Sequence, residues 1–201
     1  MRRSYHSNTS FLDLLFNTLL VFAALFIISF LLISPPKKEG TVEPKAEFLI
    51  VMTWPNTIDD DVDVYVEDPN EGIVFFKQQE VKLMHLDRDD VGLRGDGIMT
   101  PDGLVQFTDN REVVTLRGYT AGEYTVNIHM YSKKSKHPTP VKIEIVKINP
   151  YSIVSVTHWS LTRKGQEETA CRFTVSTDGD VISTSDLKKS LVSTITRREF
   201  Y

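Results

Sequence analysis

The sequence has a single cysteine, Cys171, so it cannot form an internal disulfide bond. This residue lies in an alternating apolar and polar stretch and is interpreted as a small buried strand residue rather than a nucleophile. Positive charge is not in excess, because the formal net charge is −4, and no basic stripe with interleaved aromatics indicates a nucleic-acid partner. A phosphate-binding glycine loop, a nucleophile elbow and a zinc-ligand spacing are also missing. We therefore expect no enzyme and no nucleic-acid binding.

Long apolar runs are equally scarce, and the one present extends from Phe11 to Ser34. Roughly 20 residues suffice to cross a bilayer as a helix. Pro35 and Pro36 follow at once, which suits the end of a retained helix better than a signal-peptide cleavage site. We predict a cytoplasmic tail over 1–10, a transmembrane helix over 11–34 and a linker over 35–45. A cleaved signal peptide is the alternative.

One carboxylate, Asp13, lies at the start of this apolar run. A charged side chain in a membrane helix costs about 2.5–3.5 kcal/mol, and such residues usually face partner helices or ion paths. Asn17 falls on the same helical face one turn further along, and Thr18 lies beside that face. The pattern predicts that Asp13, Asn17 and Thr18 take part in ion translocation. In the alternative interpretation, Ser10 and Asp13 only form a capping box at the start of the helix.

The residues Phe11, Asp13, Asn17, Leu19 and Phe22 follow a short basic tail and precede a proline-bearing linker. This arrangement resembles the single-span subunits of ion-driven membrane motors, the MotB, ExbD and TolR type. The resemblance implies that Asp13 carries the translocated H⁺ or Na⁺. It also implies a homodimer of this chain, in contact with membrane lipid, inside a ring (usually a pentamer) of a polytopic MotA/ExbB-like protein. The location implied is the bacterial inner membrane, single-pass, with the N-terminus cytoplasmic and the C-terminal domain periplasmic.

Beyond the linker, side chains alternate with a period of two, and turn signals such as Asp68-Pro-Asn70 separate the segments. Short strands of this kind predict a mainly antiparallel periplasmic β-sandwich over 46–148. Residues 149–201 are expected to complete the same domain with further strands and a short C-terminal helix near 185–195. The predicted strands cover residues 47–54, 61–67, 73–77, 103–107, 112–116, 122–131, 141–148, 152–162 and 168–175.

Acidic residues gather in two stretches, 59–63 and 87–90. Asp61 and Asp63 should share one face of a strand, and Asp87 and Asp89 repeat their spacing. Because Ca²⁺ is bound by oxygen ligands, these four carboxylates predict a calcium site in the β domain. The alternative is a solvated acidic edge. In that case the carboxylates would pair with arginines, namely Arg88, Arg94 and Arg111.

A second resemblance covers much of this domain. The matching segments are Trp54, Asp61-Val-Asp63, Glu67-Asp-Pro69, Leu86-Asp-Arg-Asp89 with Gly92, and Gly122-Glu-Tyr-Thr-Val126. In order and spacing they resemble the bacterial YfaP-like β-sandwich domain, which implies the fold but names no periplasmic target. Two functions therefore stay open. One is a motor subunit that carries an ion, and the other is a membrane-anchored interaction or calcium-binding protein without ion transport.

Overall fold

A computed structural model describes residues 8–33, 45–91, 97–100, 103–106 and 109–199 of the protein. The chain divides into two compact units, residues 1–43 and 44–201, and each is considered by itself. Most of the predicted tail and linker lies outside the described residues. Arg94 and Gly92 also lie outside the described residues.

The first unit contains helix α1, Thr9–Ile33, which nearly coincides with the helix predicted over 11–34. Leucine, phenylalanine and isoleucine dominate it, and no proline interrupts its backbone hydrogen bonding. Residues 9–30 are long and apolar enough to cross a membrane, although a signal sequence meets the same criterion.

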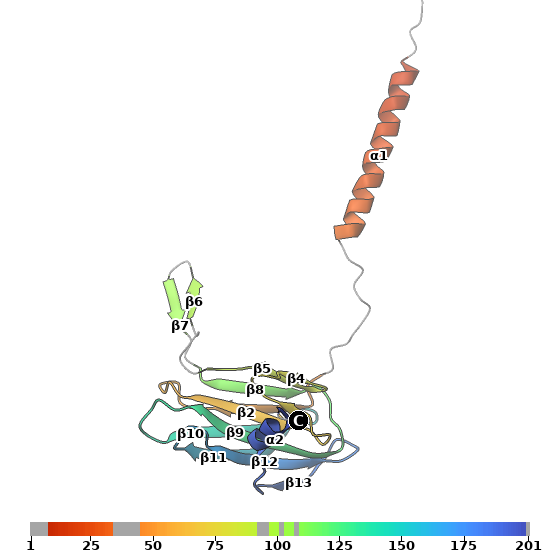
Figure 1. Cartoon of the computed structure of the whole chain (residues 1–201). Helices are drawn as coiled ribbons and strands as arrows, with labels where there is room; N and C mark the ends of the chain where they lie inside the picture. Colours follow the sequence, from red (N-terminus) through yellow and green to blue (C-terminus); the bar gives the residue numbers. More distant parts are fainter. Residues whose placement is uncertain (1–7, 34–44, 92–96, 101–102, 107–108, 200–201) are drawn as a thin grey trace, which may run out of the picture. The chain divides into compact units, whose positions relative to one another are not determined.

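The second unit is built from two antiparallel sheets, shown in Figure 1. Sheet A has the strand order β11-β10-β1-β8-β5-β4, sheet B has the order β13-β12-β9-β2-β3, and β6 and β7 form a hairpin of their own. The strands are β1 (Phe48–Thr53), β2 (Asp61–Glu67), β3 (Ile73–Val74), β4 (Glu80–Val81), β5 (Met84–Arg88), β6 (Gly97–Thr100), β7 (Gly103–Gln106), β8 (Arg111–Leu116), β9 (Gly122–Ser132), β10 (Thr139–Lys147), β11 (Ser152–Leu161), β12 (Glu167–Val175) and β13 (Val181–Ser185).

The main hydrophobic core lies between sheets A and B and follows from the alternation in their strands. In β1, Phe48, Ile50 and Met52 are fully buried while the residues between them are partly exposed. The alternate residues of β2 and β9 join the same core, and Phe48 contacts Phe173 of β12 with ring centroids 5.6 Å apart. The predicted β-sandwich is therefore confirmed.

A short helix at the C-terminus, α2 (Leu191–Glu199), packs on the outer face of sheet B. Its Leu191 is fully buried in a small second cluster with Tyr65 and Ile73. The predicted short helix is confirmed, but it begins later than residue 185. The reason is that 181–185 pairs with β12 as β13, and Ser190 then accepts the N–H of Ser193 at 3.1 Å as an N-cap.

Strand β3 is too short to cover β2. It pairs only with Val66 and Glu67, so the first part of β2 has β9 on one side and no ladder partner among the described strands on the other. Backbone N–H groups on such an edge need other acceptors. The carboxylates described below lie at this edge.

Candidate functional site

The polar stripe on α1 consists of Asp13 and Asn17, which lie four residues apart and so share one face of the helix. Asp13 is the only titratable residue of α1. The hydroxyl of Thr18 donates to the carbonyl of Leu14 at 2.8 Å, so it is already engaged within the helix. No residue of the apolar span is buried within the described part of the chain.

In the β-sandwich, a glutamate replaces the missing ladder partner of β2. The N–H of Val64 donates to Oε2 of Glu112, on β8 of the opposite sheet, at 2.6 Å. Glu112 is buried because it shares the alternation of Val114 and Leu116, which face the core. An acidic side chain at a core-facing position was the signal in the sequence that could have predicted this residue.

Three carboxylates meet beside this contact. Asp63 of β2, Asp89 just after β5 and Glu112 of β8 each place an oxygen within 4.8 Å of the other two. Asp63 and Glu112 are 4% and 1% exposed, whereas Asp89 is exposed to solvent. The group therefore joins both sheets and opens to solvent on the side of Asp89.

Several oxygens of these carboxylates lack a hydrogen-bond donor. Oδ2 of Asp63, Oε1 of Glu112 and Oδ1 of the neighbouring Asp61 are buried without a hydrogen-bond partner. His129 lies opposite Asp63 on β9, but its Nδ1 is 3.6 Å from Oδ2 of Asp63, beyond hydrogen-bond distance. Buried polar atoms are normally paired, so these oxygens are exceptions that need a ligand or a proton.

The electrostatic environment of the group disfavours negative charge. Burial raises the pKa of Glu112 well above its usual range, and the nearby charges of Asp63 and Asp89 raise it further. Burial also raises the pKa of Asp63. Burial together with the charges of Asp63 and Asp89 raises the pKa of Asp61 to about 6. His129 beside Asp63 and Lys134 near Asp61 act in the opposite direction, but burial and the mutual repulsion of the carboxylates outweigh them.

Of the four aspartates predicted to bind calcium, the structure brings Asp63 and Asp89 together and places Asp61 within electrostatic reach of both. Asp87 lies elsewhere, since its Oδ1 accepts from Nη2 of Arg117 at 3.2 Å. A bulge explains the difference. The register between β5 and β8 shifts between Leu86 and Arg88, so Asp87 does not repeat the alternation expected of a regular strand.

Ion pairs with arginine account for other acidic residues nearby but not for this group. Arg88 pairs with Asp90 at 3.1 Å and also with Asp109, and Arg111 pairs with Asp109 at 3.6 Å. The predicted pairing of an acidic edge with Arg88 and Arg111 therefore engages Asp90 and Asp109. Neither Asp63 nor Glu112 has an arginine or lysine partner among the described ion pairs.

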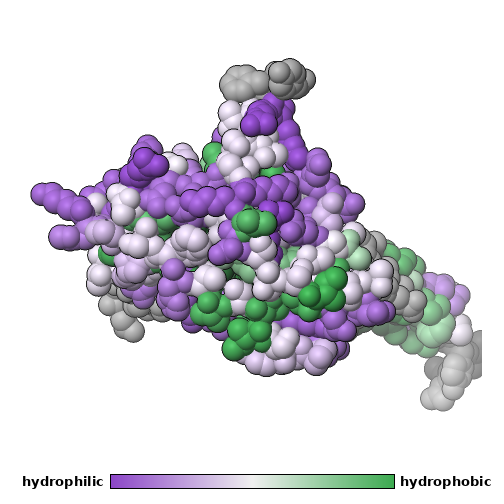
Figure 2. Space-filling view, turned by 90° about the horizontal axis from the view of Figure 1, so that it is seen from below, coloured by the Kyte–Doolittle hydropathy of each residue, from purple (hydrophilic) through white to green (hydrophobic). Residues whose placement is uncertain are grey.

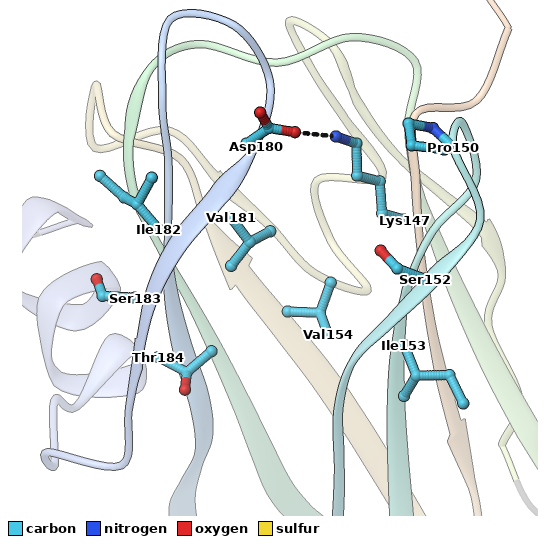
Figure 3. Close-up of a pocket in the computed structure, with 10 residues that line it drawn as sticks. All are labelled: Lys147, Pro150, Ser152, Ile153, Val154, Asp180, Val181, Ile182, Ser183 and Thr184. Carbon is cyan, nitrogen blue, oxygen red and sulfur yellow. Dashed lines mark hydrogen bonds and ion pairs between the residues drawn. The ribbon is translucent and has the colours of Figure 1, made fainter.

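A separate groove of about 530 Å³ lies between the edge strands β11 and β13 (Figure 3). Lys147 and Asp180 form an ion pair across it at 2.8 Å. Ile153 and Ile182 of this groove are exposed. On the face of the molecule drawn in Figure 2, hydrophobic residues form islands in a largely polar surface. Because the charged side chains of the groove satisfy each other, its chemistry selects no particular ligand.

Comparison of the chain with known proteins does not assign it to a family. No family model matches the chain, and no curated protein matches it. Among solved structures, the fold is similar to one described as "unknown function protein SAV2460", with a TM-score of 0.46 and 12% identity over 74% of this chain and 94% of the other. The two resemblances noted from the sequence therefore stay predictions.

Proposed function

We propose that this chain is the ion-carrying, stator-like subunit of a proton- or sodium-driven membrane motor, with Asp13 as the group that binds and releases the ion. The supporting observation is that Asp13 is the only titratable residue in a helix long and apolar enough to span a membrane. Because a carboxylate there costs about 2.5–3.5 kcal/mol, its retention favours a role in which it faces partner helices. Asn17 on the same face supports that role.

A single helix forms no pore, so the polar stripe requires other chains. In the proposed complex, two copies of this chain lie inside a ring of a polytopic MotA/ExbB-like protein, with the N-terminus in the cytoplasm and the β-sandwich in the periplasm. Ion binding neutralises Asp13 and lets it pass the ring, and ion release restores the charge. The sandwich then transmits the resulting motion to a target in the cell envelope.

The proposal is tested on the complex captured from its native membrane through a tag on this chain. Native mass spectrometry should show two copies together with several copies of a multi-span protein. Reconstituted into liposomes, the complex should conduct H⁺ or Na⁺ down an imposed gradient, read with a pH-sensitive or sodium-sensitive dye.

The decisive variant is Asp13→Asn, which is nearly isosteric but cannot cycle a charge. We expect it to assemble normally and to lose ion flux, whereas the control Asp13→Glu keeps a titratable group and part of the flux. Full flux in Asp13→Asn, or a lone copy of this chain without a partner, would favour the alternative of an anchored interaction protein without ion transport.

A further inference from the structure

We infer that Asp63, Asp89 and Glu112 form a calcium site that ties sheet A to sheet B, with Asp61 at its margin. The site is independent of Asp13 and of the proposed motor function. It differs from the ligand set expected from the sequence, because Glu112 takes the place of Asp87.

The first argument is the source of the ligands. Asp63 belongs to sheet B. Glu112 lies in β8 of sheet A, and Asp89 comes directly after β5 of the same sheet. One oxygen of each residue lies within 4.8 Å of the other two. Ca²⁺ binds oxygens at about 2.3–2.6 Å, so two ligands on opposite sides of the ion are about 4.6–5.2 Å apart. The three oxygens therefore fit around one ion.

The second argument is the unpartnered state of the buried oxygens. Oδ2 of Asp63 and Oε1 of Glu112 have no hydrogen-bond donor, although both residues are more than nine-tenths buried. The other oxygen of Glu112, Oε2, accepts from the N–H of Val64, so Oε1 remains available to bind an ion. A bound cation would satisfy both oxygens at once.

The third argument concerns the choice of ion. The three grouped ligands are all carboxylates, which suits a hard cation and not zinc or copper, whose sites favour sulfur or imidazole. Three carboxylates that bind partly in a bidentate way, together with water, fill the 6–8 positions typical of Ca²⁺, whereas Mg²⁺ usually keeps several waters and takes only one or two carboxylates. Exposed Asp89 provides the entry side.

The test uses the full chain in detergent micelles after removal of metal with a chelator. Isothermal titration calorimetry with calcium chloride should show one ion per chain. Saturating calcium should raise the melting temperature by several degrees, since an ion that binds only the folded state stabilises it. Magnesium chloride at the same concentration should raise it less.

The variants Asp63→Asn and Glu112→Gln keep the side-chain shape and remove repulsion, so both should fold without metal and bind calcium at least tenfold more weakly. Asp87→Asn is the matched control. It belongs to the same acidic stretch but pairs with Arg117, so it should bind calcium like the parent.

Three results would overturn the inference: no calcium binding by the parent chain at millimolar concentration, unchanged affinity in both Asp63→Asn and Glu112→Gln, or an equal loss in Asp87→Asn. A response to magnesium without one to calcium would overturn the assignment of the ion. Hydrogen exchange offers an independent readout, because calcium should slow exchange at the amide of Val64, whose acceptor Glu112 it would hold in place.

Discussion

Asp60 and Asp63 are near neighbours in the chain but meet opposite electrostatic conditions. Asp60 is fully buried and accepts from Lys133 Nζ at 2.9 Å and from the backbone N–H groups of Lys134 and Ser135 at 2.6 and 2.8 Å. Burial alone would raise the pKa of Asp60, but hydrogen bonds from Ser135, Thr139 and Lys133 outweigh it and hold that pKa well below its usual range. Asp60 is therefore a structural carboxylate, whereas Oδ2 of Asp63 is buried without a hydrogen-bond donor.

Replacing Asp60 with alanine should destabilise the β-sandwich by about 3–5 kcal/mol, because it leaves the buried ammonium of Lys133 without its carboxylate. The measurement is urea unfolding at pH 7. Asp59→Ala is the control: Asp59 pairs with Lys134 where both side chains are 38% exposed, so the change should cost less than about 1 kcal/mol. Equal losses in the two variants would contradict the structural role of Asp60.

The same carboxylate sets the direction of a pH effect. Since its folded pKa is lowered, Asp60 contributes stability above its unfolded value of about 3.9, and the contribution is lost as the pH falls through the folded value. The parent should therefore lose more stability between pH 5 and pH 3 than Asp60→Ala does.

The sequence placed Asp63 and Asp89 among the predicted calcium ligands, but it did not predict that Glu112 joins them or that Asp87 lies elsewhere. Spacing alone pairs Asp87 with Asp89, because regular alternation sends both to one face. The bulge next to Leu86 breaks that alternation, and nothing in the local sequence marks a bulge. Glu112 was missed because it was read only as part of a strand, although its core-facing position is unusual for an acid.

At the scale of elements, α2 depends on both its cap and its buried face. Glu167 of β12 accepts from the N–H groups of Leu191 and Val192 at 2.7 and 3.1 Å, which satisfies the first turn of the helix. Leu191 is then fully buried against sheet B. The helix is therefore fixed by tertiary contacts that the short apolar pattern in the sequence could not specify.

We expect Leu191→Ala to lower the free energy of unfolding by about 2–4 kcal/mol, because it removes a fully buried side chain. Leu187→Ala, at a residue that is 67% exposed, should change it by less than about 0.5 kcal/mol. Denaturant unfolding followed by tryptophan fluorescence measures both variants. An unchanged midpoint in Leu191→Ala would mean that α2 detaches without affecting the sandwich.

For the whole molecule, period-two alternation was sufficient to predict a sandwich, because a sheet with one buried face imposes that pattern on its strands. It was not sufficient for the shortest strands. β4 spans two residues, too few to show any period, and β3 ends at Val74 although the predicted strand continued to residue 77. β5 and β6 were not predicted, and β13 was missed next to the predicted helix. The apolar helix was predictable because a helix that crosses the hydrocarbon core of a membrane needs about 20 mostly apolar residues, and the sequence has one such run.

The position of β1 has a mechanical consequence. β1 is the first strand after the linker region, and it lies inside sheet A between β8 and β10. Ladder hydrogen bonds are perpendicular to the strands, so a pull along β1 strains them together in shear instead of breaking them one after another. Tension applied through the linker would act on this strand first.

Single-molecule pulling on residues 44–201 can compare two directions of load. Handles at Lys45→Cys and Lys136→Cys place the force along β1, whereas handles at Lys45→Cys and Ile148→Cys act at one end of the β1–β10 pair and peel it apart. The natural Cys171 is buried and should not compete for the handles. We expect a higher rupture force in the first geometry, and equal forces would show that β1 does not resist the load. Because β1 lies inside sheet A, the sandwich is expected to resist tension along this strand better than tension that peels it from β10.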